Sequence, residues 1–194
     1  MVNNFLTEVL GYLELEEIKT EYAIKGRYAD YVIQLNKKQR IIVEVKAYSI
    51  DLNNGHIRQA LDYAANEAVN WVLLTNGRQY QLSRVIFGKP MTHKVIYDLN
   101  LKDKDDFKKA TTEFEYITKK GLSTGALEKY WKRFQASEPI NLCKYLYKPN
   151  IIKILKRRLK QEANLNFSEQ EIFNSIHKIV TTKLEVKKPR YSKT

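Results

Sequence analysis

Apolar and polar residues alternate with a period of two in two neighbouring stretches of the chain. The runs ADYVIQL and RIIVEVKAY flank a polar Asn36-Lys37-Lys38-Gln39 turn, which predicts an antiparallel β-hairpin over residues 28–46. Charged residues interrupt these apolar strands, with Asp30 in the first and Glu44 and Lys46 in the second. Glu44 and Lys46 are two apart, so both project from one face. Charges inside strands this apolar indicate a functional site.

The rest of the first hundred residues predicts helices and strands in an alternating order. Apolar residues at helical spacing favour helices at 3–13 and 56–69, the second behind a capping segment at 51–55. Strands are expected at 21–24, 70–75, 79–87 and 93–99, with Asn76-Gly77 as a hairpin turn. The order helix, three strands, helix, three strands predicts an α/β (α+β) core, a mixed central sheet flanked by helices.

Strand signals stop after residue 101, and helical spacing takes over. Helices are expected at 105–117, 123–134, 141–146 and 150–161, and a capping box at Ser168-Glu169-Gln170-Glu171 opens a last one. We therefore expect a core at 1–100, a basic helical region at 101–186 and a loose basic tail at 187–194.

The net charge of +12 is concentrated in the second half of the chain. Residues 1–100 carry 12 Lys and Arg against 11 Asp and Glu, whereas residues 101–194 carry 22 against 11. A basic surface of this size favours a polyanionic partner, nucleic acid first and an anionic membrane second. A general bias toward lysine is the alternative explanation.

The densest basic cluster lies in the expected helix 150–161, and nearby tyrosines accompany further lysines. The cluster consists of Lys153, Lys156, Arg157, Arg158 and Lys160. It predicts either a phosphate-binding face or an ordinary solvated helix. Tyr145 and Tyr147, beside Lys144 and Lys148, either stack on bases or pack in a core.

Several classes of protein are excluded by composition. No apolar run approaches the roughly 18 residues of a membrane span, and no signal pattern opens the chain, so we expect a cytoplasmic protein without a membrane partner. Cys143 is the single cysteine, which excludes an intramolecular disulfide and a cysteine zinc site. The three histidines, His56, His93 and His177, are scattered and form no metal-ligand pair.

The charged residues of the hairpin suit metal-dependent chemistry. An antiparallel hairpin brings Asp30 opposite the end of the second strand, so the carboxylates of Asp30 and Glu44 converge. Converging oxygens suit Mg²⁺, with the main-chain carbonyl of Val45 as a further ligand. Lys46 would orient an attacking water or neutralise phosphate charge. A solvated strand that alternates Glu and Lys is the alternative, which the isoleucine and valine flanks disfavour.

Four motifs in order carry a family resemblance over residues 1–100. They are Gly26-Arg27-Tyr28-Ala29-Asp30-Tyr31, Glu44-Val45-Lys46, Gln59-Ala60-Leu61-Asp62-Tyr63 and Thr75-Asn76-Gly77. The chain resembles the PD-(D/E)xK nuclease superfamily, and in particular the N-terminal nuclease domain of type I restriction enzyme R subunits. The resemblance implies a restriction-endonuclease-like fold.

The resemblance also implies roles for individual residues. Asp30 and Glu44 would bind Mg²⁺, which Mn²⁺ can replace, and Lys46 would assist the nucleophile. Gln59 and Tyr63, one helical turn apart, would face the site, with Gln59 orienting Lys46 or contacting the phosphate.

The resemblance further implies residues that contact nucleic acid and a third acidic metal ligand. Arg27 and Tyr63 would contact nucleic acid, and Glu8 or Glu21 would supply a third acidic ligand. Ala29 stands where a proline often precedes the aspartate.

The expected function is a Mg²⁺-dependent endonuclease that hydrolyses DNA phosphodiester bonds in restriction or DNA processing. The alternative is a catalytically weak or inactive nuclease-like module that binds nucleic acid within a larger complex. RNA stays open as a substrate, and a homodimer or partner subunits stay open as assemblies. No base-reading motif is recognisable, so we expect recognition by backbone and shape.

Overall fold

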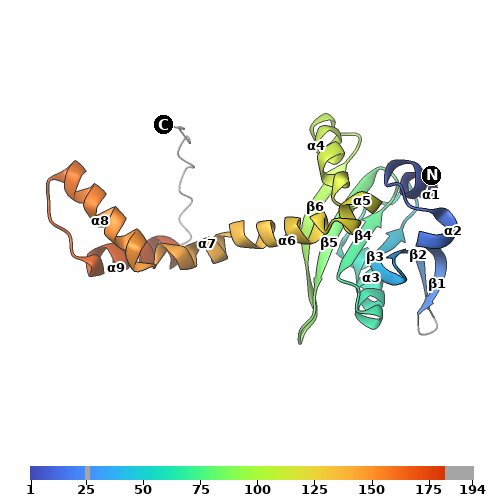
Figure 1. The fold of residues 1–194 in the computed structure, drawn as a ribbon, viewed down its shortest axis with the longest axis horizontal. Coiled ribbons are helices and arrows are strands. Elements are labelled where there is room, and N and C mark those ends of the chain that lie inside the picture. The colour runs from blue at the N-terminus through green and yellow to red at the C-terminus, as the bar shows by residue number, and fades with distance from the viewer. Residues whose placement is uncertain (25–26, 182–194) are drawn as a thin grey trace. The chain divides into compact units, whose positions relative to one another are not determined.

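The computed structural model describes residues 1–24 and 27–181, and within them the core is a six-stranded sheet (Figure 1). Its strands lie in chain order: β1 (Ile18–Ile24), β2 (Arg27–Leu35), β3 (Lys38–Val45), β4 (Trp71–Thr75), β5 (Gln79–Ile86) and β6 (Thr92–Asn100). Neighbours are antiparallel except β3 and β4, which are parallel. A parallel pair needs a crossover, and the helix α3 (Asn54–Glu67) provides it. The mixed sheet with helical cover confirms the predicted fold class.

The predicted hairpin is β2 and β3, joined by a shorter turn than expected. Asn36 and Lys37 have φ angles of 52° and 60°, and Leu35 already pairs with Lys38. Two consecutive residues with positive φ form a turn whose twist matches that of the flanking strands. Lys38 and Gln39 therefore belong to β3 rather than to the turn.

Helix α3 packs on one face of the sheet. Its small residues Ala60 and Ala64 are fully buried against strand residues that include Ile42, Val72 and Leu74. The small side chains let the helix backbone approach the sheet closely. The helix begins two residues earlier than predicted because Asn53 caps it.

The other face of the sheet is covered by segments far apart in the chain. Phe5 packs on Tyr80 of β5 and on Phe114, with ring centroids 4.7 and 5.1 Å away. Phe114 belongs to α4 (Lys104–Glu115), which contacts β6. These aromatic contacts join the N-terminal segment and α4 over β5 and β6.

The N-terminal segment differs from the single helix expected at 3–13. It forms α1 (Val2–Asn4) and a π-helical turn, η1 (Phe5–Val9), and the chain turns at Gly11, where φ is 78°. A further short helix, α2 (Glu14–Glu17), follows, and β1 begins at Ile18 rather than at residue 21. Positive φ suits glycine, which explains why the helical pattern ends there.

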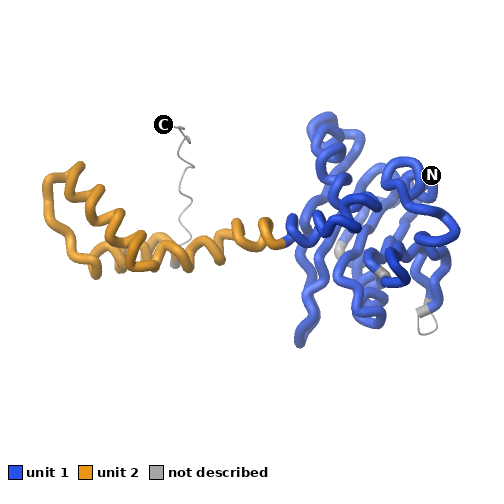
Figure 2. Tube along the Cα trace, viewed as in Figure 1, with its two compact units in different colours: residues 1–131 blue, residues 132–194 orange. Residues whose placement is uncertain are grey.

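The structure divides into two compact units, residues 1–131 and residues 132–194 (Figure 2). The first unit extends about thirty residues past the boundary expected from the strand signals, because α4 contacts β6 and Trp131 packs on Trp71. The helix expected at 123–134 is replaced by α5 (Lys119–Ser123) and α6 (Ala126–Ser137), with Gly125 at φ 70° between them. Residue 187 and those after it, expected to form a basic tail, lie outside the described residues.

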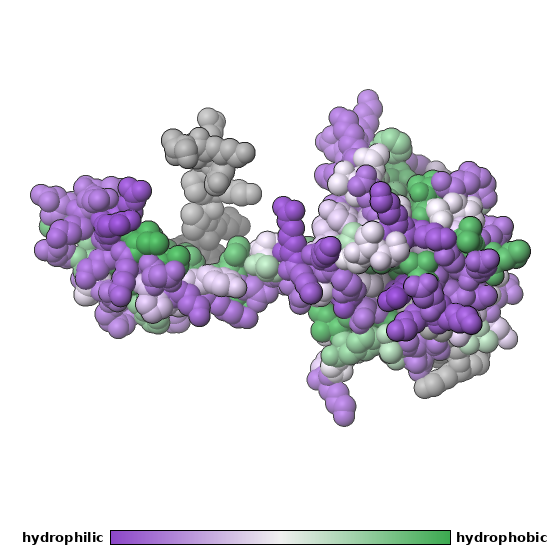
Figure 3. All heavy atoms as spheres, in the orientation of Figure 1, coloured by the Kyte–Doolittle hydropathy of each residue, from purple (hydrophilic) through white to green (hydrophobic). Residues whose placement is uncertain are grey.

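The described part of the second unit is helical. It contains the end of α6 followed by α7 (Pro139–Leu146), α8 (Pro149–Ala163) and α9 (Glu169–Thr181). Ile152 of α8 packs on Ile172 and Ile176 of α9 in a small core. In the view of Figure 3, hydrophilic residues cover much of α8. No helix within residues 1–24 and 27–181 has the length and apolar character that a membrane span requires.

Candidate active site

The end of the β2–β3 hairpin brings the three predicted residues together. The register that pairs Tyr31 with Val43 places Asp30 across from Glu44. The Oδ2 atom of Asp30 accepts a hydrogen bond of 2.7 Å from the Val45 amide. The Nζ atom of Lys46 donates to Oε1 of Glu44 at 2.6 Å. Two carboxylates and an ammonium group thus meet where β3 ends beside the first half of β2.

Glu44 is a buried carboxylate, and one of its two oxygens has no hydrogen-bond partner among the described residues. Its exposed fraction is 1%, and its Oε2 atom has no hydrogen-bond partner among the described residues. Burial raises the pKa of Glu44, the hydrogen bond from Lys46 acts in the opposite direction, and the nearby charge of Asp30 raises it further. Buried polar atoms are almost always paired, so an unpaired carboxylate oxygen indicates a missing partner.

A hollow of about 790 Å³ opens beside these residues. Asp30, Val45 and Lys46 line it together with Glu21, and further lining comes from Met1, Val2, Thr20, Tyr31 and Ala47. Glu21 lies between the paired positions Thr20 and Tyr22 on β1, across from Asp30, and has a φ angle of 47°. A left-handed conformation is uncommon outside glycine, and such residues concentrate at functional sites.

The two candidates for a third acidic ligand are therefore placed differently. Glu21 reaches the hollow, whereas Glu8 lies exposed on η1 and is absent from the described lining. Within the described chain, no group of three or more His, Cys, Asp or Glu side chains is arranged to hold a metal. The unpaired oxygen of Glu44 and the facing carboxylate of Asp30 nevertheless form a hard oxygen donor set of the kind that Mg²⁺ takes with one or two carboxylates.

The two predicted site residues of α3, Gln59 and Tyr63, differ in their exposure to solvent. Gln59 is exposed, and its Nε2 atom donates to the hydroxyl of Tyr63 at 2.9 Å. Tyr63 is 2% exposed and belongs to the core beneath α3. The structure thus gives Tyr63 a contact with Gln59 and little surface of its own for a contact with nucleic acid. Gly26 lies outside the described residues, and so does the side chain of Arg27.

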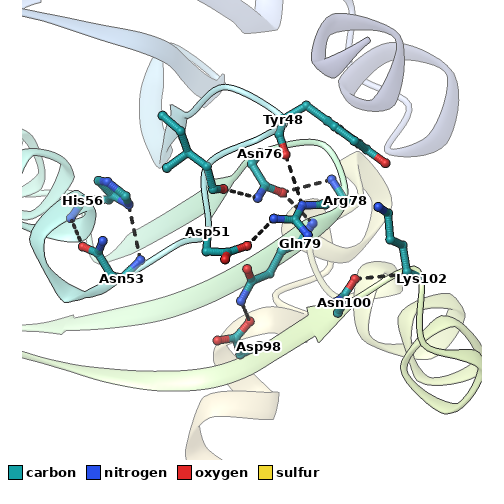
Figure 4. A network of polar contacts seen from close by, with 11 residues as sticks. Tyr48, Asp51, Asn53, His56, Asn76, Arg78, Gln79, Asp98, Asn100 and Lys102 are labelled. Atoms are coloured by element: carbon teal, nitrogen blue, oxygen red, sulfur yellow. Dashed lines mark hydrogen bonds and ion pairs between the residues drawn. The ribbon is translucent and has the colours of Figure 1, made fainter.

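The Thr75-Asn76-Gly77 motif holds the segment that leaves Lys46. The Lys46 amide donates to the carbonyl of Thr75 at 2.8 Å, which continues the parallel pairing of β3 and β4. Asn76 is 1% exposed; its Nδ2 atom donates to the carbonyl of Ile50 at 2.7 Å. Its Oδ1 atom accepts from the amides of Arg78 and Gln79 at 3.1 and 2.8 Å (Figure 4).

Arg78 adds a second set of contacts to the same loop. Its Nε atom donates to the carbonyl of Tyr48 at 3.1 Å, and its guanidinium pairs with the carboxylate of Asp51 (Figure 4). The loop from residue 47 to residue 53 is therefore fastened to the β4–β5 turn before α3 begins. We refer to Asn76 and Arg78 as the loop brace.

The loop brace was missed by sequence reasoning, which used Asn76-Gly77 only as a turn signal and as a match to a motif. An asparagine directly after a strand as apolar as Trp-Val-Leu-Leu-Thr is the signal that would have indicated it.

The start of α3 confirms the predicted cap. The Oδ1 atom of Asn53 accepts from the amides of Gly55 and His56 at 2.8 and 3.3 Å, and Nδ1 of His56 accepts from the Asn53 amide at 3.3 Å (Figure 4). His56 thus has a capping role.

The basic cluster of α8 belongs to the second unit. Lys153, Arg157, Arg158 and Lys160 are exposed, and Lys156 is half-buried. This exposure is required by both interpretations, a phosphate-binding face and a solvated helix.

Comparison with known proteins adds one finding. The model of the family described as Type I restriction enzyme R protein N terminus matches residues 1–99, just over half of the 194-residue chain. Searches of curated proteins and of solved structures returned no significant match. The matched segment contains the entire β2–β3 hairpin, α3 and the loop brace. The chain therefore belongs to the family of the N-terminal domain of type I restriction enzyme R proteins.

Proposed function

We propose that the chain is a Mg²⁺-dependent endonuclease that hydrolyses DNA phosphodiester bonds at the end of the β2–β3 hairpin. Membership of the family indicates a restriction-related nuclease role. The observation that carries the finer proposal is the buried Glu44, whose Oε2 atom lacks a partner beside Asp30 and Lys46.

Asp30 and Glu44 would hold the metal, with the carbonyl of Val45 as a further ligand and Glu21 close by. A bound Mg²⁺ ion neutralises phosphate charge and lowers the pKa of a water molecule. Lys46 would hold the attacking water and offset the negative charge that develops on the phosphate oxygens. The water oxygen would bond to phosphorus as the water loses a proton to solvent, the bond to one ester oxygen would break, and that oxygen would take up a proton from solvent.

The remaining residues would orient this chemistry. The hydrogen bond to Thr75 and the loop brace restrain the main chain at Lys46 and directly after it, which supports a fixed position for its side chain. Gln59 would contact the phosphate from α3, held by the Tyr63 hydroxyl. Arg27 and the basic residues of α8 would contact the DNA backbone without reading bases.

The test is a cleavage assay over duplex, single-stranded and branched DNA and RNA, with Mg²⁺ or Mn²⁺. We expect Asp30→Ala, Glu44→Ala and Lys46→Ala each to abolish cleavage while circular dichroism reports an unchanged fold. Glu8→Ala is the matched control, because Glu8 is an exposed acidic residue outside the described lining of the hollow. Wild-type protein that cuts none of these substrates would refute the proposal.

A second candidate function is a nuclease-like module that binds nucleic acid within a larger complex without cutting it. The observation in its favour is that the described residues hold no group of three or more metal-ligating side chains. Calorimetric titration with Mg²⁺ and Mn²⁺ separates the two functions. Binding that is lost in both Asp30→Ala and Glu44→Ala supports the nuclease, and the absence of such binding supports the module.

A further inference from the structure

An open hollow of about 440 Å³ lies in the second unit, beside α7. It is lined by Gln135, Ala136, Asn141, Lys144, Tyr145 and Lys148. None of these residues belongs to the hairpin site. The lining combines one aromatic ring with two cations and two amides, a composition that suits a ligand with a flat ring and negative charge.

The two tyrosines of this region have different environments. The ring of Tyr147 packs on Phe173, with centroids 5.2 Å apart, and its hydroxyl lies 3.2 Å from Nδ1 of His177. Tyr147 is therefore a packing residue, as one of the two sequence interpretations predicts. Tyr145, in contrast, is 60% exposed and lines the hollow. The core interpretation consequently does not account for Tyr145.

Tyr145 belongs to a polar stripe rather than to an apolar one. Asn141, Lys144, Tyr145 and Lys148 have the spacing i, i+3, i+4 and i+7, which places them along one side of α7 and its end. Packing against a protein core normally uses apolar residues at this spacing. This side of α7 is therefore not a packing face, and its exposed tyrosine, cations and amide can contact a polar ligand in the hollow.

Hydrogen bonds organise the edge of the hollow. The Nδ2 atom of Asn141 donates to the carbonyl of Gln135 at 2.7 Å, and Nζ of Lys144 donates to Oδ1 of Asn141 at 3.0 Å. An ammonium group has three donors, so Lys144 can still donate to an anion. The contact with Asn141 holds this cation at the rim on the same helix side as the Tyr145 ring.

The charge of the second unit matches an anionic ligand. Residues 132–194 carry 15 Lys and Arg against 5 Asp and Glu, whereas residues 1–131 carry 19 against 17. A field of this sign raises the local concentration of polyanions. Among polyanions, nucleic acid is the class that also offers flat rings to an exposed aromatic side chain.

We propose that this hollow binds single-stranded nucleic acid, with a base stacked on Tyr145 and the flanking phosphates held by Lys144 and Lys148. A base in a duplex is already stacked on both faces, so the site selects unpaired nucleotides. The site uses no residue of the hairpin, and its existence does not depend on the proposed nuclease activity. If both proposals hold, the second unit binds single-stranded nucleic acid and the first unit of the same chain cuts DNA.

The test uses the full chain in EDTA, where cleavage cannot occur, and a fluorescently labelled 15-nucleotide oligothymidine. Anisotropy should show that Tyr145→Ala weakens binding by about 5- to 20-fold, the scale of one lost base stack, whereas Tyr145→Phe stays within about twofold. The matched control is Ile140→Ala. Ile140 is also on α7 and is 68% exposed, but it is outside the described lining of the hollow, so this variant should keep the wild-type affinity. The affinity for duplex DNA of the same length should fall by about twofold or less in Tyr145→Ala.

Spectroscopy and salt provide further readouts. A 2-aminopurine base in the oligonucleotide should be quenched on binding to wild type and not to Tyr145→Ala. Lys144→Ala should lower the slope of log affinity against log salt by about 0.7, the value for one phosphate contact on a single strand. A parallel arm with oligouridine distinguishes DNA from RNA as the source of the strand.

Three outcomes would overturn the proposal. They are an affinity for the single strand that Tyr145→Ala leaves unchanged, an equal loss for duplex and single strand, and equal losses in Tyr145→Phe and Tyr145→Ala. Competition by polyglutamate as strong as that by the oligonucleotide would assign the hollow to acidic peptides instead. Because every measurement is made without metal, failure here leaves the nuclease proposal standing, and the reverse also holds.

Discussion

The loop brace is open to a quantitative test through Asn76. Replacing Asn76 with alanine removes three hydrogen bonds. Its Nδ2 atom donates one to the carbonyl of Ile50, and its Oδ1 atom accepts one each from the amides of Arg78 and Gln79. Asn76 is 1% exposed, so water cannot readily replace its side chain. At about 1 kcal/mol for each net hydrogen bond, Asn76→Ala should lower the free energy of unfolding by about 3 kcal/mol.

Asn53→Ala is the matched control for this prediction. Asn53 also accepts two amide hydrogen bonds through its Oδ1 atom, but it is exposed, and a capping asparagine contributes about 1 kcal/mol. Urea unfolding followed by tryptophan fluorescence measures both variants, because the two tryptophans, Trp71 and Trp131, lie in the first unit. If Asn76→Ala costs no more than Asn53→Ala, the buried bonds of Asn76 do not fasten the loop.

Further predictions concern the packing and titration of the first unit. Burial raises the pKa of Tyr12, whose hydroxyl also donates to a main-chain carbonyl at 2.5 Å. A raised folded-state pKa means that the folded chain keeps the proton which the unfolded chain releases, so stability should fall as the pH rises above about 10. In urea unfolding between pH 8 and 11, Tyr12→Phe should show a shallower decline than wild type, and an equal decline would contradict this assignment. Arg84 pairs with Glu128 at 2.6 Å and lies over two tryptophan rings. A double-mutant cycle of Arg84→Ala and Glu128→Ala should therefore give a coupling free energy of about 1 kcal/mol, and zero coupling would show that the ion pair does not stabilise the fold. Gly121→Ala should lower the free energy of unfolding by about 1 to 3 kcal/mol, because a Cβ there would clash with two main-chain carbonyl oxygens; an unchanged urea midpoint would exclude the clash.

The sheet and the hairpin could be predicted from the sequence because their signals are local. Period-two alternation predicted β2 and β3, and the run 70–75 between turn signals predicted β4, which the structure places at residues 71–75. The convergence of Asp30 and Glu44 followed from antiparallel pairing alone. Each of these inferences needs only a few consecutive residues and the geometry of a strand.

Other features depend on contacts that no local pattern contains. Glu21 has a left-handed conformation within β1, across from Asp30, and no glycine or asparagine in the sequence indicates it. The loop brace joins residues about 26 to 30 positions apart. The extension of the first unit to residue 131 depends on the packing of Trp131 against Trp71. Such tertiary contacts decide conformation where local preference is weak.

The parallel pairing of β3 with β4 has a consequence for the order in which the chain folds. The candidate-site residues from Asp30 to Arg78 lie in one continuous segment, in which α3 connects the parallel strands β3 and β4, whereas Glu21 comes from β1. The β3–β4 pairing joins residues roughly 30 positions apart, so it costs more loop-closure entropy than the local β2–β3 hairpin and should form after it. The Lys46 amide, bonded to Thr75, should then exchange with solvent only when the whole segment opens. Activity would accordingly be lost in one cooperative step, without gradual fraying of the site.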